Sequence, residues 1–240
     1  MKDAVIYATA DREIKDANRE IVRDFGRLKT ARFDETHVIR MVTALYREQA
    51  RKLRRRYYEV GFEAYLLGLY LCGITGVKAH SMAEKAITND WVDERLKEVN
   101  PTTLFRFDTE TERKAQRLIE ALTGAAETDG SASGGGGKPH AGTDGEIDRA
   151  MKAWSKQAAQ YALSITDDAL LAAYGDAGEG VMWLSERDSR VCTECHQLDG
   201  KVFRVDEVPK KPHWLCRCRL VPAKGRAEAK DGRGATEGDG

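Results

Sequence analysis

The sequence predicts a mainly α-helical protein with a small α+β domain near its C-terminal end. Apolar residues recur at helical spacing over much of residues 1–128 and again from residue 147. Short β-like runs follow residue 180, beside a cluster of cysteines. Residues 129–146, DGSASGGGGKPHAGTDGE, have no large apolar side chain and are predicted to form a flexible linker. The expected organisation is a helical body (1–128), this linker, a C-terminal domain (147–222) and a tail (223–240).

The longest helix is expected from near Val38 to about Cys72, with Asp34 or Thr36 as its N-terminal cap. One of its faces is apolar except for a single glutamine, and consists of Val38, Val42, Leu45, Gln49, Leu53, Tyr57 and Val60. Further helices are predicted over residues 11–28, 81–99 and 109–126. The most apolar run, residues 64–77, is too short to span a membrane, which takes about 20 residues. It is expected to be a buried helix end followed by a glycine-rich turn.

Charge and compartment limit the possible functions. The chain has 240 residues with 39 basic and 39 acidic side chains, so a generally basic nucleic-acid coat protein is not expected. The N-terminal residues lack the apolar core of a signal peptide, which predicts a reducing compartment and no membrane partner. Under reducing conditions, clustered cysteines indicate metal ligands or catalysts more than disulfides.

A basic run on the long predicted helix is a weak candidate contact for DNA phosphates or for an acidic protein surface. It has one acidic neighbour, Glu48, and four of its members share a helix face. The alternative is an ordinary solvated helix face. The run consists of Arg47, Arg51, Lys52, Arg54, Arg55 and Arg56.

The C-terminal domain is predicted to begin with a helix over residues 147–174. Its apolar face is Met151, Trp154, Ala158, Tyr161 and Ile165. Strands are expected over 181–184 and 201–204, with a turn at 199–200 just before the second. The tail, residues 223–240, lacks aromatic and β-branched aliphatic residues and is expected to be disordered.

The most informative pattern is a set of cysteines and a histidine near the end of the chain. Its first part is Cys192-x2-Cys195, and its second part, after a 17-residue gap, is His213-x2-Cys216-x-Cys218. This spacing is typical of a tetrahedral zinc site. Cys192 and Cys195, with two of His213, Cys216 and Cys218, are the candidate ligands of a structural zinc ion. Cys72 is expected to be a small core residue.

Three alternatives for this cluster stay open. The cysteines could form two disulfides or remain free buried thiols. A catalytic zinc ion is also possible, although a shell rich in thiolates leaves no position for water. Zinc-stapled nucleases pair a metal-activating residue with a histidine base. His213 lies within ligand spacing of Cys216, but no second histidine or acidic pair is placed to hold a catalytic metal. Asp188 and Arg190 are expected to brace the Cys-x2-Cys turn, and Arg217 to bond nearby backbone carbonyls.

The segment from Trp183 to Pro222 contains three short motifs after an aromatic strand: DSRVCTEC from Asp188, LDGKVF from Leu198 and PHWLCRC from Pro212. Together they resemble the C-terminal signature of phage Mu F-like minor head proteins, the phage head morphogenesis family. The family pattern is an aromatic strand followed by D-x-R-x-C-x-x-C, L-D-G-K-x-[FY] and P-H-x-x-C-R-C. Residues 100–121 and 157–169 are similar more weakly, so that the resemblance covers roughly residues 100–222.

The resemblance implies a phage or prophage minor head protein of the virion, without enzymatic activity. Its partners would be the portal protein and other capsid components, with packaged DNA as a further candidate and no small-molecule substrate. It would act in head morphogenesis and in DNA packaging or delivery, in the host cytoplasm during assembly. A zinc-ribbon protein that binds nucleic acid and, third, a metal-dependent nuclease are the alternative functions.

Overall fold

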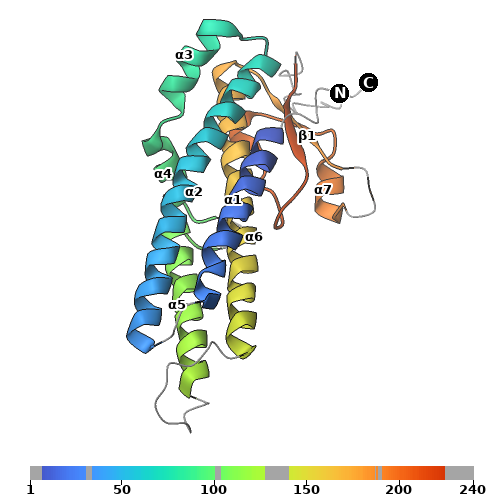
Figure 1. The fold of residues 1–240 in the computed structure, drawn as a ribbon. Helices are drawn as coiled ribbons and strands as arrows, with labels where there is room; N and C mark the ends of the chain where they lie inside the picture. The colour runs from blue at the N-terminus through green and yellow to red at the C-terminus, as the bar shows by residue number, and fades with distance from the viewer. Residues whose placement is uncertain are drawn as a thin grey trace, which may run out of the picture.

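The computed structural model describes residues 7–30, 34–100, 104–127, 141–186, 188 and 191–224 (Figure 1). It is mainly helical, with a small antiparallel sheet near the C-terminal end, and the predicted fold class is confirmed. Most of the predicted linker, up to residue 140, and the predicted tail from residue 225 lie outside the described residues. No helix in the described ranges combines the length and apolar character needed to cross a membrane.

Four long helices lie side by side in a bundle (Figure 1). They are α1 (Ala8–Gly26), α2 (Glu35–Leu71), α5 (Phe107–Glu127) and α6 (Ala141–Asp176), and a short 3-10 turn, η2 (Leu28–Thr30), follows α1. Helix α2 matches its prediction closely: Asp34 caps it by accepting a hydrogen bond from the His37 backbone N–H at 2.8 Å. The chain turns after α2 at Gly73, whose φ of 89° suits glycine.

The apolar face predicted for α2 is the one it buries. Val42, Leu53 and Val60 are each no more than 2% exposed. The polar member, Gln49, is also buried, and its side chain donates to the Asp24 carboxylate of α1 at 2.7 Å. Gln49 can be buried in the core because the Asp24 carboxylate of α1 accepts its hydrogen bond.

A close approach of α2 to α6 depends on a glycine. A Cβ atom built on Gly68 would lie 2.6 Å from the Cβ of Ala173, much nearer than van der Waals contact allows. This contact lies in the core cluster that also contains Tyr174 and the buried strand residue Trp183. The small residues at the crossing thus bring the bundle against the C-terminal sheet.

The helix predicted over residues 81–99 is two helices in the structure. Helix α3 (Gly76–Ala86) ends before Ile87, and α4 (Asn89–Lys97) begins after Thr88. The extended Thr88 accepts a hydrogen bond from the Trp91 backbone N–H at 3.1 Å, which caps α4. Ile87 is 1% exposed, so burial of this side chain accompanies the break.

Helix α6 is shared by both predicted halves of the chain. It begins at Ala141, inside the predicted linker, so the predicted boundary at residue 147 falls within its first turns. Trp154 and Tyr161 pack in the core of the long helices, whereas Leu170 and Tyr174 pack against the strands and the cysteines. One helix therefore connects the bundle core to the C-terminal unit.

The sheet has the order β2-β1-β3, and both pairings are antiparallel. Its strands are β1 (Val181–Leu184), β2 (Val202–Phe203) and β3 (Arg219–Pro222). β1 and β2 match the predicted strands, with β2 shorter than expected. β3 was not predicted; it is an edge strand that ends in proline, a residue tolerated at an edge. Along the chain, the short helix α7 (Thr193–Leu198) connects β1 to β2, and the 3-10 turn η3 (Val205–Glu207) connects β2 to β3.

Candidate metal centre

The structure brings all five predicted ligands together. Cys192 caps the N-terminus of α7 and Cys195 lies in its first turn, where the Cys195 backbone N–H donates to the Cys192 sulfur at 3.4 Å. His213 and Cys216 lie in the loop after η3, and Cys218 directly precedes β3. The cluster therefore forms where α7, this loop and the start of β3 meet.

Cys195 is the central member of the cluster. Its Sγ lies 3.5 Å from His213 Nε2 and 3.5 Å from Cys216 Sγ. Two overlapping sets, Cys192–Cys195–His213 and Cys195–Cys216–Cys218, each have all donor atoms within 4.8 Å of one another. Thiolates about 2.3 Å from a tetrahedral zinc ion lie roughly 3.8 Å apart, which is close to these separations. The arrangement fits a metal ion bound through Cys195.

The donor atoms are sheltered from solvent and none is used in a disulfide. Cys195, Cys216 and Cys218 are buried, Cys192 is half-buried, and all four are free. Burial, and a hydrogen bond with Cys192, raise the pKa of the Cys195 thiol to about 12. Hydrogen bonding with Cys218, together with burial, raises the pKa of Cys216, whereas hydrogen bonding with Cys216 lowers the pKa of Cys218. A divalent cation would therefore displace thiol protons when it binds.

The imidazole of His213 is oriented for ligation. Its Nδ1 lies 3.2 Å from the Trp214 carbonyl oxygen, which can only accept, so Nδ1 carries the proton. Nε2 then presents its lone pair towards Cys195. A backbone carbonyl that orients the second ring nitrogen in this way is typical of metal-bound histidine.

A glutamine on α6 holds the loop between His213 and Cys216. The Gln160 side-chain oxygen accepts a hydrogen bond from the Leu215 backbone N–H at 2.7 Å. Leu215 has a φ of 52°, a conformation unfavourable for a branched side chain. Gln160 is missed by sequence reasoning because it lies beside an apolar stripe and outside the cysteine pattern. Its bond stabilises the tight turn that places the last three ligands.

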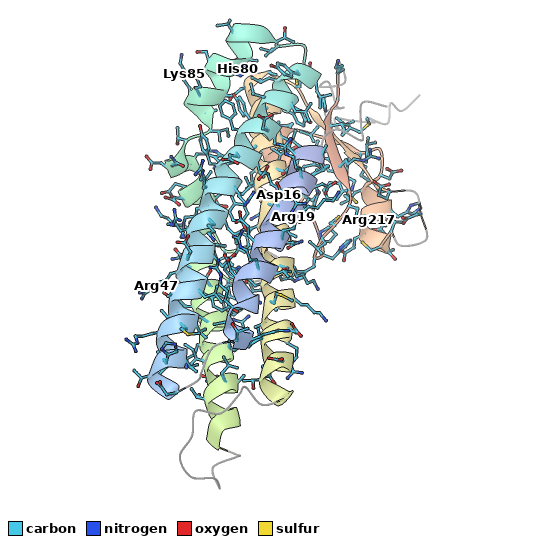
Figure 2. The ribbon with its side chains drawn as sticks, viewed as in Figure 1. Asp16, Arg19, Arg47, His80, Lys85 and Arg217 are labelled. Carbon is cyan, nitrogen blue, oxygen red and sulfur yellow. The ribbon has the colours of Figure 1, made fainter. Side chains whose placement is uncertain are left out.

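An ion pair connects the two parts of the signature. Arg217, labelled at the edge of the C-terminal unit in Figure 2, donates to both carboxylate oxygens of Asp188 at 2.7 and 2.8 Å. The expectation that Arg217 would bond backbone carbonyls is replaced by this pairing. Asp188 is therefore tied to the second cysteine pair, and Arg190 lies outside the described residues.

The LDGK element forms a turn beneath β1. The Asp199 carboxylate accepts from the Ser185 backbone N–H at 2.9 Å, and the Gly200 N–H donates to the Trp183 carbonyl at 2.8 Å. Gly200 has a φ of 74°, which suits glycine. The predicted turn before β2 therefore also fixes the end of β1.

Comparison with known proteins supports the resemblance directly. The family described as phage Mu protein F like protein matches residues 141–221. The resemblance to the phage head morphogenesis family is confirmed. The Mu F-like segment contains α6, the sheet except for Pro222 and all five candidate ligands, and it covers about a third of the chain. The weaker similarity expected over residues 100–121 lies outside the matched segment. No match is found among curated proteins or among solved structures.

The predicted basic face of α2 is largely engaged within the chain. Lys52 lies 2.8 Å from the buried Asp24 carboxylate, and Arg56 pairs with Glu13 and Glu20 of α1 at 2.7 and 2.9 Å. Arg54 pairs with Asp93 and Asp108 and lies over the Phe107 ring. Three of the six cations thus connect α2 to its neighbours.

The other three cations of the run are more exposed. Arg51 pairs with Glu48 and Arg55 with Glu59, each along the same helix. Arg47 is exposed at the side of α2 (Figure 2). A contact of this face with DNA or with the portal would therefore involve Arg47, Arg51 and Arg55 more than the other three.

Proposed function

We propose that the protein is a minor head protein of a phage or prophage virion that acts near the portal during head assembly and DNA packaging or delivery. The observation that carries this proposal is the match of the phage Mu F-like family to residues 141–221. The matched segment includes the complete cysteine and histidine cluster and the helix that joins it to the bundle. The role proposed is structural and non-enzymatic.

The proposed metal is a structural zinc ion held by Cys195 with three of Cys192, His213, Cys216 and Cys218. Thiolate and imidazole donors favour zinc over the oxygen-binding cations magnesium and calcium. The short strands of the C-terminal unit give it little sheet of its own, and its packing includes Cys195, Cys216 and Cys218. A bound ion would cross-link α7, the loop after η3 and the start of β3.

Cobalt substitution tests the ligand set. The full chain, freed of metal under reducing conditions and titrated with Co²⁺, is expected to show the absorption bands of tetrahedral thiolate coordination. Replacement of Cys195 by serine should abolish these bands, because Cys195 belongs to both ligand sets. Cys72→Ser is the matched control, since Cys72 follows α2 outside both sets. Equal spectra for the two variants would contradict the assigned centre.

The assembly role is tested separately from the metal. The chain is co-expressed with the portal and major capsid proteins of the same phage or prophage, and the assembled heads are separated by sedimentation. We expect the chain in the head fraction in few copies and cross-links between it and the portal. A chain found only in the unassembled fraction, while heads form normally, would refute the proposed role whether or not zinc is bound.

A further inference from the structure

A cavity lies between helices of the bundle, away from the sheet. Its volume is about 320 Å³, and residues of α2, α5 and α6 line it. Its walls are apolar at Leu118, Ala150 and Ala153, whereas its charged lining is Lys114, Arg117, Glu146 and Arg149. The part of α6 that lines it lies near the end of the bundle away from α7 and β1 (Figure 1), so the proposed metal centre does not explain the cavity.

Positive charge around this cavity exceeds negative charge. Glu110 is shared by Arg113 at 2.8 Å and Lys114 at 3.3 Å, so that one carboxylate serves two cations. Arg149 pairs with Glu146. The lining itself holds three cations, Lys114, Arg117 and Arg149, and one carboxylate, Glu146, and no carboxylate among the described residues pairs with Arg117.

The electrostatic state of Lys114 agrees with this excess. Only 14% of its side chain is exposed. Burial, and the neighbouring cations Arg113 and Arg117, lower its pKa although Glu110 pairs with it. An anion in the cavity would offset this repulsion.

Two buried donors next to the same cavity lack partners among the described residues. The Tyr46 side chain lines the cavity and is 1% exposed, and its hydroxyl is one of these donors. The other is the N–H of the Trp154 ring, whose centroid lies 5.0 Å from that of the Tyr46 ring. A buried donor without an acceptor destabilises the folded protein, so a ligand rich in acceptors would be stabilised here.

We propose that this cavity binds the phosphate group of a phosphate monoester, with Lys114, Arg117 and Arg149 as charged contacts and the Tyr46 hydroxyl as a neutral donor. A phosphate monoester carries about −1.5 to −2 charges near pH 7, which matches the excess of two cations. The guanidinium groups can each donate two parallel hydrogen bonds to phosphate oxygens. The apolar walls leave room for a small organic body attached to the phosphate.

The test measures binding of inorganic phosphate to the full chain by amide chemical-shift titration at constant ionic strength. We expect saturable shifts at Ala150 and Ala153 and much weaker binding of acetate. Arg117→Gln should raise the phosphate Kd about tenfold, as expected for loss of one charge-assisted contact. Arg19→Gln, on α1 (Figure 2), removes the same charge outside the cavity lining and should leave the Kd unchanged.

Further arms identify the source of the phosphate and guard against misfolding. A short single-stranded oligonucleotide is compared with and without a terminal phosphate. Tighter binding of the phosphorylated strand than of inorganic phosphate assigns the site to nucleic-acid ends, and the reverse order assigns it to free phosphate. Tyr46→Phe keeps the ring and should weaken phosphate binding severalfold without loss of helicity. Equal binding of acetate, or equal Kd values for the Arg117 and Arg19 variants, would overturn the proposal.

Discussion

Replacement of Gly68 by alanine tests the close crossing of α2 and α6 that brings the bundle against the C-terminal unit. The added Cβ would lie 2.6 Å from the Cβ of Ala173. Neither carbon can rotate away, so the two backbones must separate. Overpacking of this kind costs about 1–3 kcal/mol, whereas alanine recovers about 1 kcal/mol of helix propensity. An overlap this severe should cost near the upper limit of that range. After the gain in helix propensity, we expect the free energy of unfolding to fall by about 2 kcal/mol.

The measurement is urea-induced unfolding of the full chain, followed by circular dichroism. Gly124→Ala is the matched control, because Gly124 is also helical and a Cβ there meets nothing within 4 Å. We expect this control to stabilise the protein by about 0.5 kcal/mol, so the same substitution has opposite signs at the two positions. A Gly68→Ala variant as stable as the wild type would show that the two helices do not pack as closely as described.

Two further predictions concern α6. Burial, and the neighbouring Asp167, raise the pKa of Asp168 to about 7, so the folded state holds a proton that the unfolded state loses near pH 4. The stability contributed by that proton is lost as pH rises from 4 to 7. The Asp168→Asn variant should therefore be more stable than the wild type at pH 8 but not at pH 4. Parallel curves of unfolding free energy against pH for the variant and the wild type would contradict this. The Tyr174 hydroxyl donates to the Leu220 carbonyl of β3 at 3.1 Å in a buried site. Tyr174→Phe should cost about 1 kcal/mol in the same unfolding assay, and an unchanged midpoint would exclude a stabilising role for this bond.

The parts of the fold that the sequence predicts well are those with a long local period. Helix α2 buries the stripe that its spacing indicates, and its cap at Asp34 is visible as a residue type. The break between α3 and α4 is less visible, because a threonine cap interrupts a pattern that otherwise continues through Thr88. The edge strand β3 is too short to show alternation, and its pairing with β1 is a long-range contact.

The candidate site follows the same distinction between local and distant contacts. The ligand types and their spacing are local, and the structure brings all five side chains together. The supporting bonds are distant: Gln160 reaches Leu215 from α6, and Asp188 reaches Arg217 across the cluster. The partners of the basic run on α2 are also distant in sequence, so the run appears to have few acidic partners when the sequence is read alone. In the structure, α1 supplies carboxylates to Lys52 and Arg56.

The most direct test of the proposed centre is the metal content of the full chain, purified under reducing conditions and weighed by native mass spectrometry. We predict one zinc ion per chain, lost on chelation together with ordered structure in the C-terminal unit. The Cys195→Ser variant should contain no zinc, because Cys195 belongs to both candidate ligand sets. The Cys72→Ser variant should retain zinc, because Cys72 belongs to neither set. A folded, reduced protein without bound metal would contradict the proposal that zinc holds α7 and β3 together.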